Sequence, residues 1–372
     1  MNPPRLRFAP RSFAIARGAE AAAWRGACAM AVAAFSLPAL SAEPAAMCAA
    51  EHDDRARLAC YDKLFRPPDV PAAGASTTPI APTGEPPIAP PSSARAEPAP
   101  ASATSRLWEL DRAEKRGTFL VKTYLPNFLL PLHLATHLEH APSSPTHPAA
   151  PANPTYQRAE VKLQISLRAK VAQGVLLPDA DLWFAYTQRS MWQLWDHADS
   201  APFRSTDYQP EVIYVVPIPQ TAAALPGGWR WRMLQTGLVH QSNGQADPLS
   251  RSWNRAFVGA GFERGDVALQ LRAMHRLPEG GQDDNPDVTH YIGGGEAVLS
   301  WLPGRSIAAL TWRTGQSLRR GSVQLDWTYP VDSEQPLGLR WYLQLFSGYG
   351  ETLLEYNQRH SSIGFGLTLF QF

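Results

Sequence analysis

Leu238-Val-His-Gln-Ser-Asn-Gly-Gln-Ala-Asp-Pro-Leu-Ser-Arg-Ser-Trp-Asn-Arg255 is the stretch around which the chain is organised. It starts as the end of an expected strand, passes through a turn with a glycine and an Asp-Pro pair, and enters a second strand. Side chains two residues apart on a strand share a face, so His240 and Ser242 are expected on one side. An imidazole there can take a proton from the serine hydroxyl.

Asn254 lies on the returning strand, where it shares its face with Ala256, Val258 and other apolar residues. If both strands turn these faces to the same side, a nucleophile, a base and a neutral residue that orients the base meet on an apolar surface. A Ser two residues from a His is common on strands, so that pair alone does not indicate an enzyme.

The same stretch carries a resemblance to a known family. His-Gln-Ser-Asn-Gly, then Asp-Pro, then Ser-Arg-Ser-Trp-Asn-Arg resembles the signature of the bacterial outer-membrane phospholipase A family. The resemblance extends over roughly residues 106–372 through four more matches, Tyr186-Thr-Gln188, Ser200-Ala-Pro-Phe-Arg204, Asp283-Asp-Asn-Pro-Asp287 and Phe346-Ser-Gly-Tyr-Gly-Glu351.

The resemblance implies a serine hydrolase site. Ser242 corresponds to the nucleophile, His240 to the general base and then acid, and Asn254 to the residue that holds the imidazole. Backbone N–H groups at Ser242 and Gly244 are candidates for the oxyanion hole, and a glycine can adopt turn conformations that other residues resist. Gly244 is equally explained as an ordinary turn glycine.

Calcium is the cofactor that the resemblance implies. By the resemblance, its ligands are Ser250, the Gln245 carbonyl and Ser200 of a second subunit. Asp247 and Asp284 would form a weaker calcium site in the monomer. Oxygen ligands of these kinds suit calcium. The family usually has Arg at the position of Gln245, but a carbonyl ligand does not depend on the side chain. Acidic loops such as that at 283–287 are more often simply solvated.

A homodimer is the third implication. Gln188 matches a polar residue of the family's dimer interface within the lipid zone, where an unpaired amide is costly. A lumen-facing Gln is the alternative. Met191 departs from the aromatic residue usual near this position, which leaves the packing there open.

Composition sets broader limits. A net charge of +1 over 372 residues gives no electrostatic reason to expect nucleic acid as a partner. Twelve Trp, 11 Tyr and 14 Phe suit interfacial aromatic girdles, but a large soluble β domain could carry as many. Composition alone does not separate a membrane protein from a soluble one.

The first hundred residues predict export and a spacer. Residues 1–42 have a basic region, a short apolar core and an Ala-Leu-Ser-Ala end, which is typical of a signal peptide. Residues 43–65 form a small helical module, in which Cys48 and Cys60 are predicted to form a disulfide; metal binding with His52 is the alternative. Residues 66–105 are rich in Pro and Ala, cannot bury enough surface to fold, and predict a disordered periplasmic linker.

The remaining residues, 106–372, predict an all-β domain. About twelve runs with strand character lie near 118–132, 161–171, 181–191, 211–218, 229–242, 252–262, 267–274, 289–302, 307–312, 321–329, 337–346 and 363–372. Several alternate between apolar and polar residues, as in Val323, Leu325 and Trp327 against Gln324 and Asp326. An even number of long strands in an exported chain favours an antiparallel transmembrane β-barrel.

We therefore expect a calcium-dependent, dimeric phospholipase A1 or A2 in the bacterial outer membrane, with phospholipids as substrates. A non-enzymatic pore or structural barrel would explain the strands and the export signal equally well, but not the grouping of His, Ser and Asn. A soluble exported esterase is a third possibility.

Overall fold

The computed structural model describes residues 48, 51, 53–65, 102–336 and 338–369, and it contains two compact units, 1–91 and 92–372. In the first unit, helix α3 (Asp54–Phe65) starts after Asp53, whose carboxylate accepts a hydrogen bond from the Ala56 backbone at 2.9 Å. The expected disulfide joins Cys48 to Cys60. The predicted signal peptide and residues 66–101 of the predicted linker lie outside the described residues.

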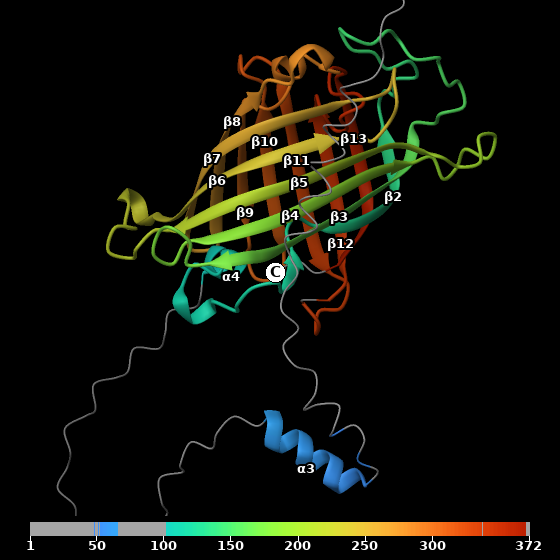
Figure 1. The fold of residues 1–372 in the computed structure, drawn as a ribbon. Helices are drawn as coiled ribbons and strands as arrows, with labels where there is room; N and C mark the ends of the chain where they lie inside the picture. The colour runs from blue at the N-terminus through green and yellow to red at the C-terminus, as the bar shows by residue number, and fades with distance from the viewer. Residues whose placement is uncertain (1–47, 49–50, 52, 66–101, 337, 370–372) are drawn as a thin grey trace, which may run out of the picture. The chain divides into compact units, whose positions relative to one another are not determined.

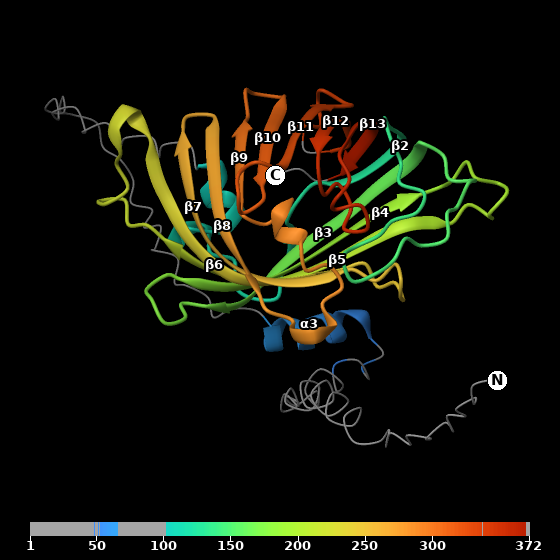
Figure 2. The same cartoon turned by 90° about the horizontal axis from the view of Figure 1, so that it is seen from above.

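The second unit is an antiparallel β-barrel that closes because β3 pairs with β2 on one side and with β4 on the other. Figure 1 shows these strands side by side, and Figure 2 shows the curved wall that they form. The twelve barrel strands are β2 (Asn127–Ala135), β3 (Ala159–Gln173), β4 (Asp181–Trp192), β5 (Phe203–Pro217), β6 (Arg230–Ser242), β7 (Ser252–Arg264), β8 (Val267–Leu277), β9 (Gly295–Trp301), β10 (Ile307–Thr314), β11 (Gly321–Pro330), β12 (Arg340–Gly348) and β13 (His360–Leu369). A short strand, β1 (Val121–Thr123), also pairs with β3.

The barrel is apolar outside and polar inside, which follows from the two-residue period of its strands. On β11, Val323, Leu325 and Trp327 are exposed on the outer surface, whereas Asp326 and Thr328 are buried in the interior. Exposed Leu, Ile, Val, Phe and Trp side chains occur on nearly all the strands. Such a continuous apolar surface is stable only against lipid, so this is a transmembrane barrel.

Charged residues fill the interior. Lys162 pairs with Glu351 at 2.7 Å, and the same carboxylate accepts a hydrogen bond from Ser362 at 2.8 Å. Arg272 and Glu211 pair at 3.4 Å in another part of the lumen. These contacts join strands and loops that are distant in sequence. They give the polar side chains inside the barrel hydrogen-bond and ion-pair partners.

One end of the barrel holds helix α4 (Ala103–Trp108), which Figure 1 shows beside the strand ends. The Ser102 side chain caps its start and Glu109, in the left-handed conformation, ends it. This helix begins inside the range 66–105 predicted as linker. Burial alone would raise the pKa of Glu109, but hydrogen bonds from Lys122 and Lys170 outweigh that effect and lower the pKa to about 2.

Trp108 anchors α4 in the lumen. Its ring meets Trp183 edge-on at a centroid distance of 5.9 Å and Tyr124 at 6.0 Å, and the Arg168 guanidinium lies 4.3 Å from the ring centroid. These residues border an apolar cluster inside the α4 end of the barrel.

Three strand starts differ most from the expected ones. The run near 118–132 is interrupted by the segment that contains Pro126, because proline has no N–H to donate to a strand partner. Strand β5 starts at Phe203, eight residues earlier than expected, since its first half turns Arg204 and Asp207 inward and lacks an apolar signature. The run near 289–302 starts with a 3-10 turn at Val288–His290, and β9 begins only at Gly295.

Among the described residues, no helix is long and apolar enough to span a bilayer.

We expect Trp108→Ala to lower the free energy of unfolding by about 3–5 kcal/mol, because it removes a buried ring and leaves a cavity. Urea unfolding in detergent micelles measures this change. Trp195→Ala serves as the control, since the Trp195 side chain is exposed in the loop after β4 and its loss should cost less than about 1 kcal/mol. Equal losses in the two variants would contradict the anchoring role of Trp108.

Candidate active site

The pairing of β6 with β7 places His240 directly opposite Asn254. The Nδ1 atom of His240 lies 2.9 Å from Oδ1 of Asn254, which is hydrogen-bonding distance. Residues opposite each other in an antiparallel pair have neighbouring side chains, so the strand register alone creates this contact.

Both side chains belong to the outer face of the barrel. Their neighbours on that face, Leu238 and Val258, are 57% and 62% exposed, while Val239 and Arg255 line the interior cavity. The expected apolar surface around the site is therefore present, and it is the surface that faces lipid.

Ser242 ends β6 on the face that His240 occupies. It pairs with Ser252 of β7 and with Tyr208 of β5. Among the described residues, no hydrogen bond joins Ser242 to His240. Catalytic hydrogen bonds are often long or absent until substrate binds. The structure places Ser242 and His240 on the same face of β6 without a hydrogen bond between them.

The turn after Ser242 is held by Asn243, a buried side chain. Its Nδ2 donates to the Leu249 carbonyl at 2.7 Å, and its Oδ1 accepts from the Arg251 backbone N–H at 2.9 Å. Gly244 follows with a φ of +65°, and a Cβ there would lie 3.0 Å from the Tyr208 ring. Both the backbone conformation and the close approach of this ring favour glycine.

Asn254 has a second partner that the sequence did not suggest. Its Nδ2 donates to Oε1 of Glu279 at 2.6 Å, and Oε2 of Glu279 pairs with Arg276 at 3.2 Å. Glu279 lies just after β8, in a Gly-rich loop without any catalytic motif. Only the fold brings it to the site.

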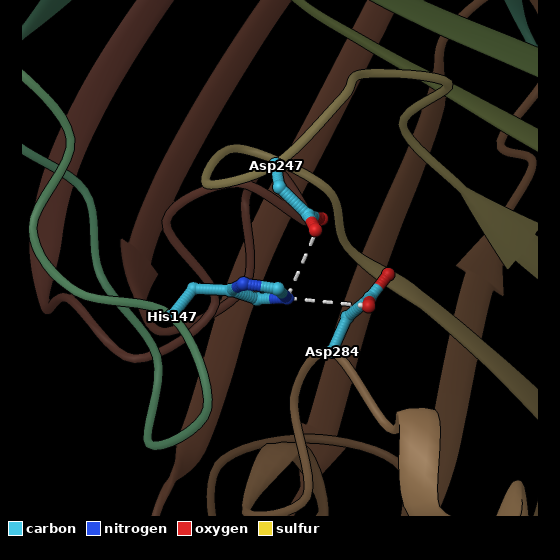
Figure 3. Close-up of side chains that lie close together, drawn as sticks. All are labelled: His147, Asp247 and Asp284. Carbon is cyan, nitrogen blue, oxygen red and sulfur yellow. Dashed lines mark hydrogen bonds and ion pairs between the residues drawn. The ribbon is translucent and has the colours of Figure 1, made fainter. Parts of the chain in front are cut away.

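The turn after β6 meets the acidic loop, and Figure 3 shows Asp247 and Asp284 facing His147. Ser250 donates to Asp284 at 2.6 Å. His147 Nε2 lies 3.2 Å from Asp284 and 3.8 Å from Asp247. Ligand atoms of His147, Asp247 and Asp284 all lie within 4.8 Å of one another. The structure thus brings Ser250, Asp247 and Asp284 together, and it adds His147 from the Pro-rich loop between β2 and β3, which carried no signal of its own.

The other acidic residues of this loop have structural partners. Asp283 pairs with Arg276 at 2.7 Å, and Asp287 accepts a hydrogen bond from the Tyr356 hydroxyl. Only Asp284 of the three faces the candidate metal cluster.

Of the two other expected metal ligands, Gln245 lies in the same turn as Asp247 and Ser250, and Ser200 lies in another loop. The Gln245 side chain donates to the Arg204 carbonyl at 3.3 Å. Ser200 lies between β4 and β5 with a φ of +56°. Ser200 is expected to act as a calcium ligand from a second subunit.

Gln188 points outward from β4. It lies on the same face of β4 as the exposed Phe184, whereas Thr187 and Arg189 line the interior cavity. Its Oε1 accepts from the Tyr186 hydroxyl at 3.1 Å. The alternative of a lumen-facing Gln is therefore wrong.

Comparison with known proteins agrees with this architecture. The family model described as phospholipase A1 matches residues 104–369. A putative phospholipase A1 of Neisseria meningitidis serogroup B is 36% identical over 360 residues, 89% of this chain and 92% of the relative. Phospholipase A1 of Escherichia coli K12 is 34% identical over 217 residues, 57% of this chain and 70% of the relative.

Two solved structures resemble the barrel at 28% identity and a TM-score of 0.61, each covering 72% of this chain and 98% of the other. One is an active-site mutant of the outer membrane phospholipase A of Escherichia coli, in which an asparagine is replaced by alanine. The other is the outer membrane phospholipase dimer of Salmonella typhi with bound calcium. With a family model that spans most of its length and relatives that align over the same region, the chain belongs to the phospholipase A1 family.

Proposed function

We propose that this chain hydrolyses fatty-acyl esters of membrane phospholipids in the bacterial outer membrane, at a site formed by Ser242, His240 and Asn254. Its family places it among carboxylic ester hydrolases with phospholipase A1 activity. The observation that carries the assignment of the site is the 2.9 Å contact between His240 and Asn254, on a lipid-facing surface that also holds Ser242.

The geometry indicates the proton path. The Asn254 amide donates through Nδ2 to the Glu279 carboxylate, so its Oδ1 faces His240 and accepts the Nδ1 proton. Nε2 of His240 is then left unprotonated, as a general base must be.

Hydrolysis follows in two steps. His240 Nε2 takes the Ser242 proton while Oγ attacks the ester carbonyl, and the imidazolium then gives that proton to the departing lysophospholipid oxygen. Water, deprotonated by the same nitrogen, then attacks the acyl-serine; the bond to Ser242 Oγ breaks, the imidazolium returns its proton to Oγ, and the fatty acid is released. Backbone N–H groups at Ser242 and Gly244 are the candidate donors to the oxyanion.

Calcium fits part of the cluster beside the site. The carboxylates of Asp247 and Asp284 and the Ser250 hydroxyl are oxygen ligands of the kind that calcium prefers, whereas the imidazole of His147 is not. The Gln245 carbonyl and Ser200 of a second subunit complete the proposed set. A bound calcium would supply positive charge close to the developing oxyanion.

A homodimer is supported by Gln188, a polar side chain on the lipid-facing surface of β4. Its Oε1 accepts a hydrogen bond from Tyr186, but among the described residues its Nε2 has only a long 3.5 Å contact, to Ser190. An amide without a good acceptor in hydrocarbon favours association with a second subunit.

The N-terminal module with α3 is proposed to lie in the periplasm, after removal of residues 1–42.

Ser242→Ala is expected to lower phospholipid hydrolysis by at least about a thousandfold, because it removes the hydroxyl that forms the acyl intermediate. Fatty-acid release from mixed micelles by the refolded barrel measures this loss. Ser252→Ala, on the strand directly opposite, is the matched control and should retain activity. Full activity in the Ser242 variant would eliminate the proposed site.

Chelation of calcium is expected to abolish hydrolysis, and added calcium to restore it. Asp284→Asn should weaken calcium binding at least about tenfold, a change of about 1.4 kcal/mol, as measured by calorimetric titration in detergent. Asp332→Asn, in the turn after β11, is the control. Unchanged calcium affinity in the Asp284 variant would remove this residue from the metal site.

Gln188→Leu is expected to shift the protein toward the monomer, because it deletes the polar group that a second subunit would satisfy. Sedimentation equilibrium in density-matched detergent measures the dimer dissociation constant. Ser347→Ala, an outward-facing polar residue on β12, is the control. A dissociation constant that is the same in both variants would exclude Gln188 from the interface.

A further inference from the structure

Glu279 stands behind the Ser-His-Asn site as a fourth member of its hydrogen-bond chain. The chain runs from His240 Nδ1 to Asn254 Oδ1 at 2.9 Å, and from Asn254 Nδ2 to Glu279 Oε1 at 2.6 Å. The Glu279 side chain is only 13% exposed, so solvent competes little for its carboxylate.

Glu279 is itself held in place. Its second oxygen pairs with Nη2 of Arg276 at 3.2 Å, and Arg276 also contacts Asp283 at 2.7 Å and donates to the Asn285 carbonyl at 3.0 Å. Asn285 in turn accepts from the Ser252 backbone N–H at 3.1 Å. The carboxylate is therefore tied to the β8–β9 loop and to the start of β7, and not free to turn away.

The chemical consequence concerns the orientation of an amide. One end of the Asn254 side chain accepts hydrogen bonds and the other end donates them. If the NH2 end faced His240, two hydrogen-bond donors would meet at Nδ1. The imidazole would then favour the tautomer protonated at Nε2, which cannot accept the Ser242 proton. An ionised carboxylate can only accept, so it selects the NH2 end and leaves Oδ1 for His240.

Glu279 also adds charge that Asn254 lacks. A negative charge beyond the amide favours the imidazolium that forms when His240 takes a proton. Arg276 moderates this charge, whereas Asp283 is a second negative group nearby, and His275 is a further titratable group on the outer face of β8. Burial, with a smaller contribution from Asp283, raises the pKa of Glu279 above its ordinary value, although Arg276 and the Asn254 hydrogen bond act in the opposite direction.

We propose that Glu279 is a positioning residue, which orients the Asn254 amide so that His240 keeps the tautomer needed to activate Ser242. The proposal rests on the proposed function of these three residues. It assigns a task to a residue outside the sequence motif that carries the family resemblance.

Two substitutions separate orientation from charge. Glu279→Ala removes the acceptor, whereas Glu279→Gln keeps an acceptor oxygen at the same position and removes only the charge. Glu334→Ala, in the exposed turn after β11, is the matched control. Each variant is tested as the full refolded barrel, with heat modifiability on gels as the check of folding.

The first readout is steady-state hydrolysis. Glu279→Ala should lower kcat about tenfold, the equivalent of one lost hydrogen bond, with little change in KM. Glu279→Gln should recover most of that loss. A kcat that falls in Glu279→Ala and recovers in Glu279→Gln, with KM unchanged in both, is what loss and rescue of the amide orientation predict.

The second readout is the rate at which a fluorophosphonate probe labels Ser242, which reports activation of the serine without turnover of lipid. It should fall in Glu279→Ala and recover in Glu279→Gln. Wild-type kcat and labelling in the Ala variant would overturn the proposal, and so would a Gln variant as impaired as the Ala variant. If wild-type protein is not labelled, or Ser242→Ala is labelled equally, the proposed function itself fails, which is a distinguishable result.

Discussion

The register between β6 and β7 is the constraint on which the candidate site depends. It sets His240 opposite Asn254 and leaves Ser242 on the same outward face. A slip of one residue would turn the imidazole into the charged lumen and expose Val239 and Gln241 to lipid instead. The apolar requirement of the bilayer and the polar interior together oppose that slip, so the forces that stabilise the barrel also assemble the site.

This arrangement explains how a catalytic group can work on the outside of a barrel. Outward-facing leucines and valines provide the surface along which an acyl chain can lie, as Leu238 and Val258 do beside the site. The loop that carries Asp284 then brings oxygen ligands next to the turn after Ser242. Charged residues that would be costly in lipid are kept inside the barrel, where Lys162 and Glu351 pair.

Sequence patterns predicted the barrel and much of the site. Strand character predicted about twelve strands, several of them by clear two-residue alternation. The same period put His240 and Ser242 on one face, but only the register of β6 with β7 sets His240 opposite Asn254. Periodicity misplaced the start of β5, where Arg204 and Asp207 face a charged lumen and break the apolar pattern. Glu279 and His147 carried no local signal, since each reaches the site only through the folding of a long loop.

Identifying the residue that becomes acylated during turnover tests the central claim most directly. Protein quenched in acid during hydrolysis of a phospholipid would be digested and analysed by mass spectrometry. The account predicts one fatty-acyl ester on the peptide that contains Ser242, with the mass of the acyl chain supplied. Rapid turnover with no acylated serine, or with the acyl group on another residue, would contradict it.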